Sequence, residues 1–165
     1  MEKDNFGITD KISLETNKGI KSGFGFDVNV KAELFDQFGN IKETREVHNT
    51  GTDAGRYGII DQILDSPTLP KVGYMELGTG TPAATLLGAY ISGSRIAFTT
   101  KTRTNNVVTM VCTWGAGVGT GAITEAGLFD NATANTVNMW CSSSWAVVNK
   151  GSNDIFKLTW TITQN

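Results

Sequence analysis

The stretch that decides the fold reads FDVNVKAEL at residues 26–34, where apolar and polar side chains alternate at every position. A period of two places all the apolar side chains on one face of an extended chain, and it predicts a β-strand with one buried face. Residues 36–40 are turn formers, and residues 41–47 can return as a partner strand. The segment therefore predicts an antiparallel hairpin.

The rest of the chain repeats short apolar stretches separated by Gly, Thr and Asn, which together make up 54 of the 165 residues. These types are poor in helix interiors and common in turns and strands, which argues against a mainly helical protein. Further strands are expected over residues 72–77, 94–102, 107–114, 123–129, 137–148 and 155–162. Many strands at short spacing predict an all-β fold, an antiparallel β-sandwich of jelly-roll-like form.

One short helix is expected after residues 49–53, which offer an N-cap. Gly55 and Gly58 lower its intrinsic stability, so it must be held by packing against the sheet. It should end by Ser66 and Pro67. Spacings of i, i+3, i+6 and i+7 create one apolar stripe, formed by Tyr57, Ile60, Ile63 and Leu64.

Residues 1–24 show no sustained period of 2 or 3.6, and we expect them to form an extended arm before one sandwich domain at residues 25–165. The apolar side chains of the arm would be poor core on their own, and would be buried if the arm lay on a neighbouring subunit. Terminal disorder is the equally open alternative. These side chains are Phe6, Ile8, Ile12, Leu14 and Ile20.

Charge and hydropathy limit the classes of partner. Lys and Arg number 14, Asp and Glu number 16, and no stretch is densely basic. Nucleic acid and anionic membrane surfaces are therefore not expected partners. No apolar run approaches the roughly 20 residues that span a bilayer, and the N-terminus lacks an apolar signal core, so we expect neither insertion nor export by a signal peptide.

Residues that could carry metal or redox chemistry are few. His48 is the only histidine, which excludes a His-rich metal site within one chain. Cys112 and Cys141 are 29 positions apart, without a Cys-x-x-Cys spacing. Buried free thiols are the expected state, and a single disulfide stays open as an alternative. The segment GTGT at residues 78–81 lacks the Lys of a phosphate-binding loop, so we expect no cofactor and no metal.

Glu125 is the one carboxylate that the pattern places inside an apolar strand. A buried acid needs a partner, and Arg56 or Arg95 could supply a structural ion pair. A catalytic role would require a second carboxylate or a base at a set distance. Trp140 and Trp145 lie on opposite faces of a regular strand, so one of them could be exposed at an interface or a glycan site.

Several segments, in order, resemble a group of small tailed-bacteriophage virion proteins. The resemblance spans about residues 28–162 and is carried by residues 30–36, 39–40, 48–56, 75–81, 94–96, 123–130, 150–154 and 158–162, the segment ITEAGLF at 123–129 above all. It implies an all-β module on the virion, either as a decoration or cement protein on the head or as part of a collar or tail fibre. It implies no catalytic residues.

The resulting expectation is a non-enzymatic capsid decoration protein on the head surface, with the major capsid protein as partner. It should be a symmetric homo-oligomer, most simply a trimer. The arm residues, Phe6, Ile8, Ile12, Leu14 and Ile20, are the candidate capsid contact. A collar or tail-fibre component and a host-glycan-binding module are the alternatives, and an enzyme that uses Glu125 is the third class.

Overall fold

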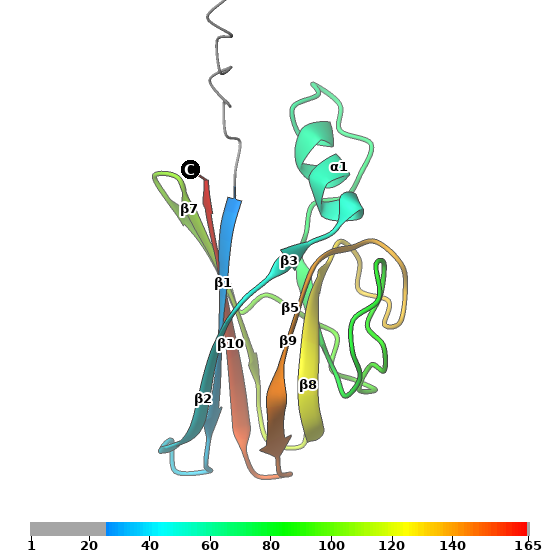
Figure 1. Cartoon of the computed structure of the whole chain (residues 1–165). Coiled ribbons are helices and arrows are strands. Elements are labelled where there is room, and N and C mark those ends of the chain that lie inside the picture. Colours follow the sequence, from blue (N-terminus) through cyan, green and yellow to red (C-terminus); the bar gives the residue numbers. More distant parts are fainter. Residues whose placement is uncertain (1–25, 165) are drawn as a thin grey trace, which may run out of the picture.

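A computed structural model describes residues 26–164 of the chain and confirms the expected all-β sandwich (Figure 1). The arm residues 1–24 therefore lie outside the described part. In chain order the elements are β1 Phe26–Phe35, β2 Ile41–His48, β3 Thr50–Gly51, α1 Asp53–Asp61, β4 Tyr74–Gly78, β5 Ile96–Ala97, β6 Thr100–Thr104, β7 Val107–Trp114, β8 Gly121–Phe129, β9 Met139–Lys150 and β10 Ile155–Gln164.

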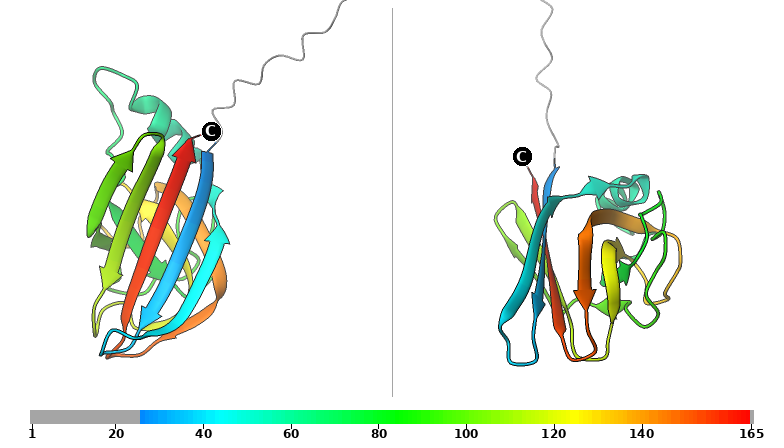
Figure 2. Two further views of the ribbon diagram at one scale, coloured as in Figure 1. Left: turned by 90° about the vertical axis from the view of Figure 1, so that its left-hand side faces the viewer. Right: turned by 60° about the horizontal axis from the view of Figure 1, so that its bottom comes forward.

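The strands form two five-stranded antiparallel sheets that pack face to face (Figure 2). Sheet A has the order β2-β1-β10-β7-β6, and sheet B has the order β3-β9-β8-β4-β5. The chain passes from one sheet to the other directly after β2, where Asn49 still donates a backbone hydrogen bond to Val28 in sheet A. β3 then pairs with β9 in sheet B.

The core lies between the sheets and is built by the alternation seen in the sequence. Val30 and Leu34 of β1 are buried, as are Leu158 and Trp160 of β10, to which β1 pairs. Trp114 is fully buried, and its indole N–H donates to the Ser94 carbonyl at 2.7 Å. Each buried indole that finds such a partner avoids the cost of an unsatisfied donor.

The outward face of sheet A carries a row of polar side chains. Thr161 of β10 lies opposite Asn29 of β1 on one side and Thr109 of β7 on the other, and Thr109 lies opposite Thr102 of β6. Directly opposed residues share a face, so these side chains form one row across the sheet. This row therefore presents hydroxyl and amide groups on the outward face of sheet A.

The stretch of residues 94–102, expected to form a single strand, contains two strands. Residues 94–102 form β5, which pairs with β4 in sheet B, and β6, which pairs with β7 in sheet A. The chain changes sheet between Ala97 and Thr100, which interrupts the strand although the sequence there is β-prone. The hairpin after β6 has the expected turn, since Asn105 adopts a φ of 52°.

β9 contains an irregularity beside β8. Ile123 pairs with Val148 and Glu125 pairs with Ser144, so that residues 145–147 of β9 lie opposite the single residue Thr124. This is a β-bulge, which bends the strand and increases its twist. On its other side β9 pairs only with the two residues of β3, so most of that side is a sheet edge in the described part of the chain.

α1 has nine residues, and no helix in the described part of the chain is long and apolar enough to cross a membrane.

Candidate functional site

The first feature of the candidate site is the way α1 is attached to sheet B. Thr52 is the N-cap, and its hydroxyl accepts a hydrogen bond from the Gly55 N–H at 3.1 Å. The same hydroxyl donates to the Trp140 carbonyl at 2.8 Å, and the Thr52 N–H also donates to that carbonyl. The cap that the sequence predicts therefore both starts the helix and anchors it on β9.

The face of α1 that meets the sheet is made of glycine. Gly55 and Gly58 are the buried residues of the helix. A Cβ added at Gly55 would meet the Trp140 backbone, and one added at Gly58 would meet the Trp140 ring, both far inside van der Waals contact. The expected packing against the sheet is confirmed, but it depends on the absence of side chains at these two positions.

The apolar stripe consequently faces solvent. At about 100° per residue, Tyr57 and Ile60 lie on the side of the helix opposite Gly55 and Gly58, and Ile63 and Leu64 follow in the loop after α1. We call the exposed apolar surface of α1 and the following loop the apolar platform. Its members, with their exposed fractions, are Tyr57 66%, Ile59 37%, Ile60 65%, Ile63 77%, Leu64 55% and Leu69 36%.

The loop that completes the platform is fixed to the helix by Asp61. The Asp61 carboxylate accepts hydrogen bonds of 2.8 Å from the Leu69 N–H and from the Thr68 hydroxyl. These bonds, that to Leu69 first, hold the pKa of Asp61 below its ordinary value. The Gln62 side chain also donates to the Leu69 carbonyl at 3.1 Å. Residues 62–69 are thus held in one arrangement next to α1.

A larger residue on the buried face should detach α1. Gly55→Ala is expected to lower the free energy of unfolding by about 1–3 kcal/mol, because the new methyl group overlaps the Trp140 backbone. Gly51→Ala is the matched control, since a Cβ there meets nothing within 4 Å. Urea unfolding and limited proteolysis of residues 53–70 measure the effect, and equal behaviour of the two variants would contradict the glycine contact.

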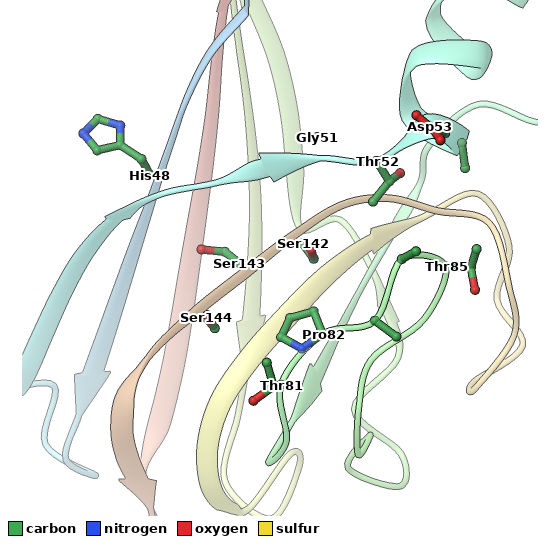
Figure 3. Close-up of a pocket in the computed structure, with 13 residues that line it drawn as sticks. His48, Gly51, Thr52, Asp53, Thr81, Pro82, Thr85, Ser142, Ser143 and Ser144 are labelled. Atoms are coloured by element: carbon green, nitrogen blue, oxygen red, sulfur yellow. The ribbon is translucent and has the colours of Figure 1, made fainter.

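The second feature is a groove of about 550 Å³ beside the start of α1 (Figure 3). One wall is the beginning of the helix at Thr52, Asp53 and Ala54, and the other is the loop of residues 81–85. β9 supplies residues 142–144 between them. Most of the lining is hydroxyl or small side chains, from His48, Gly51, Thr52, Asp53, Ala54, Thr81, Pro82, Ala83, Ala84, Thr85, Ser142, Ser143 and Ser144.

The loop wall of the groove is held by Glu125. This carboxylate is fully buried and accepts hydrogen bonds from the backbone N–H groups of Gly80 and Ala89 at 2.9 Å and of Gly88 at 3.0 Å. The expectation that Arg56 or Arg95 pairs with Glu125 is wrong. Backbone amides satisfy the buried charge instead, and both carboxylate oxygens are engaged by the loop.

Each of the two arginines forms an ion pair with an acid other than Glu125. The Arg95 guanidinium lies 2.8 Å from the Glu76 carboxylate, with side chains only 2% and 1% exposed, and its plane covers the Phe129 ring at 3.4 Å. Arg56 pairs with Asp53 on the exposed surface of α1. The buried ion pair therefore joins β4 to the chain segment after it, and the exposed one belongs to the edge of the platform.

The remaining candidate residues are the two cysteines and His48. Cys112 and Cys141 are free, and burial raises the pKa of both thiols, that of Cys112 to about 12. His48 is exposed, and its Nδ1 lies 3.8 Å from an Asp27 carboxylate oxygen. Residues 26–164 contain no group of three His, Cys, Asp or Glu side chains that could hold a metal ion.

Trp140 and Trp145 are both buried at 8% exposure, so the expectation that one could be exposed is wrong. Trp140 is covered by α1, whose Gly58 packs against its ring, and Trp145 belongs to the core. Trp114 and Trp160 are core residues, as expected. No tryptophan ring is therefore available as a stacking surface for a sugar.

The site combines a preformed apolar platform with a hydroxyl-lined groove at its base. The groove can exchange hydrogen bonds with a neutral polar group, and the platform can bury apolar surface of a protein. Comparison of the chain with protein-family models, with curated proteins and with solved structures finds no match.

Proposed function

We propose that the chain is a non-enzymatic structural protein of a tailed-bacteriophage virion, namely a decoration or cement protein that binds the major capsid protein on the head surface. The proposal starts from the ordered resemblance across residues 28–162. The all-β sandwich agrees with the kind of module that this resemblance implies.

The observation that carries the proposal is the apolar platform. Single exposed apolar residues are common, whereas a contiguous apolar patch usually marks a protein interface. Here six large exposed apolar side chains belong to one nine-residue helix and the loop after it, and Asp61 fixes that loop. Such a surface suits a protein whose work is assembly.

In this role the protein stabilises the shell by mass action, because contacts that exist only in the assembled head shift the equilibrium toward the assembled state. The proposed capsid contact remains the arm, with Phe6, Ile8, Ile12, Leu14 and Ile20, which lies outside the described residues. The protein acts as a symmetric homo-oligomer, so that each assembly offers several arms to neighbouring capsid subunits.

Labelling of intact virions tests the proposal. A gold-labelled antibody against this protein is expected to decorate the whole head surface in electron micrographs. Label confined to the neck or tail would favour a collar or tail-fibre component instead. Virions without any label would overturn the proposed function altogether.

A further inference from the structure

We propose that ordered water is bound inside the sandwich, between the side chains of Asn49 and Ser143, at the point where the chain crosses from sheet A to sheet B. Asn49 follows β2, and its N–H still donates to the Val28 carbonyl in sheet A. The next residue, Thr50, already pairs with β9 in sheet B. The bound water therefore ties this crossover to β9, and it belongs to the fold whatever the role of the chain in a virion.

The pairing of β3 with β9 brings the two side chains together. The two strands are antiparallel, with Gly51 opposite Cys141. The same register, continued by two residues, places Asn49 opposite Ser143. Directly opposed residues of an antiparallel pair share a face, and their Cβ atoms are about 4.5–5.5 Å apart. The two side chains are therefore close enough for one water molecule to reach both.

Both side chains belong to the inner face of sheet B. On its other side Ser143 lies opposite Ala126 of β8, which is a fully buried core residue. In Figure 3 the Ser143 hydroxyl lies on the side of β9 away from Pro82, although Ser143 also lines the groove. Since Asn49 is opposite Ser143, its side chain shares this inner face.

The polar atoms of these two side chains are buried, and among residues 26–164 they have no hydrogen-bond partner. They are Asn49 Oδ1, Asn49 Nδ2 and Ser143 Oγ. The Cys141 thiol lies beside the amide: burial raises the pKa of this thiol, and the Asn49 side chain shifts it in the opposite direction. A neutral thiol is only a weak donor and acceptor, so it does not replace a full partner.

Water is the ligand that suits this set of atoms. Buried polar groups in native proteins almost always have a partner, which is either another protein group or an ordered water. A buried water makes two to four hydrogen bonds. The amide offers both a donor and an acceptor, and the hydroxyl can act as either. Both groups are neutral, which favours water over an ion, because an ion would need a counter-charge.

A crystal structure of the full chain, at a resolution that shows ordered water, tests the site directly. Density for water is expected within hydrogen-bond distance of the Asn49 amide and the Ser143 hydroxyl. A direct hydrogen bond between these two side chains, a side chain of residues 1–25 bonded to them, or a site without density would each overturn the inference.

Ser143→Ala tests the same site through stability in urea. The variant is expected to raise the equilibrium constant for unfolding by about fivefold or more, because the bound water loses one of its partners. Ser144→Ala is the matched control on the exposed side of β9, with an expected change of less than about twofold.

The sign of the Ser143→Ala effect decides between a bridged and an unpaired hydroxyl. An unpaired buried hydroxyl destabilises the fold, so its removal would leave the unfolding constant unchanged or lower it. Either of these results would overturn the inference. Label on virions, or its absence, does not bear on this outcome, so the proposed function and the water site can fail separately.

Discussion

Arg95→Met is expected to lower the free energy of unfolding by about 3–5 kcal/mol, because it leaves a buried carboxylate without its cation. Arg95 Nη2 lies 2.8 Å from Glu76 Oε2, and both side chains are almost fully buried. Of the other groups near Glu76, the Asn135 N–H donates at the longer distance of 3.3 Å. Urea unfolding followed by tryptophan fluorescence measures the loss.

Two further variants show whether the uncompensated charge is the cause. Arg103→Met removes an exposed arginine from β6 and is expected to change stability by less than about 0.5 kcal/mol. The double variant Glu76→Leu/Arg95→Met removes both charges and is expected to recover most of the stability, because apolar replacement of a buried ion pair is often neutral. If the double variant were as unstable as Arg95→Met, the charge explanation would be wrong.

Glu125→Ala is expected to lower the free energy of unfolding by a similar amount, about 3–5 kcal/mol, and to release the loop wall of the groove. Three backbone N–H groups, of Gly80, Gly88 and Ala89, lose their acceptor at once. An unsatisfied buried donor costs about 1–3 kcal/mol. Hydrogen exchange of residues 79–89, measured by mass spectrometry, should rise together with the loss of stability.

Glu125→Gln is expected to have a smaller effect on stability than Glu125→Ala. The side-chain oxygen of Glu125→Gln can still accept from Gly80 and Ala89, while its amide nitrogen faces the Gly88 N–H and cannot accept from it. We expect a loss of about 1–3 kcal/mol, smaller than that of the alanine variant. Glu46→Ala, which removes an exposed carboxylate from β2, serves as control. Unchanged exchange of residues 79–89 in Glu125→Ala would refute the role of Glu125 as the loop anchor.

The strands could be predicted because their signal is local. Alternation at residues 26–34 and the turn residues after it define the first hairpin, and Asn105 marks another. The division of residues 94–102 between two sheets could not be predicted, since it is a tertiary event within a β-prone stretch. The sandwich follows from the number of strands, whereas the pairing order does not.

Periodicity alone does not show which face of a helix is buried in its own fold. Tyr57, Ile60 and Leu64 define a stripe, but a stripe does not say whether it meets the core or a partner. Gly55 and Gly58 seemed only to weaken the helix, yet they form its packing face. Their place opposite the stripe was the available signal, because small residues allow an indole to approach the helix backbone.

The buried acids could be recognised in the sequence, whereas the partner of Glu125 could not. An acid inside an apolar strand can be recognised, and Glu76 between Met75 and Leu77 has the same signal as Glu125. The partner of Glu125 could not be found in the sequence, because it is made of backbone N–H groups, which every residue but proline carries. Arg95 was the right type of partner for a buried acid, although its acid is Glu76.

The bulge in β9 has a consequence for behaviour at high concentration. A long, flat edge strand is a template on which other chains add strands and aggregate. Residues 145–147 twist the open edge of sheet B away from the flat ladder that such a template needs. Under the proposed function many copies crowd on one surface, and this twist would keep their sheets from joining into fibrils.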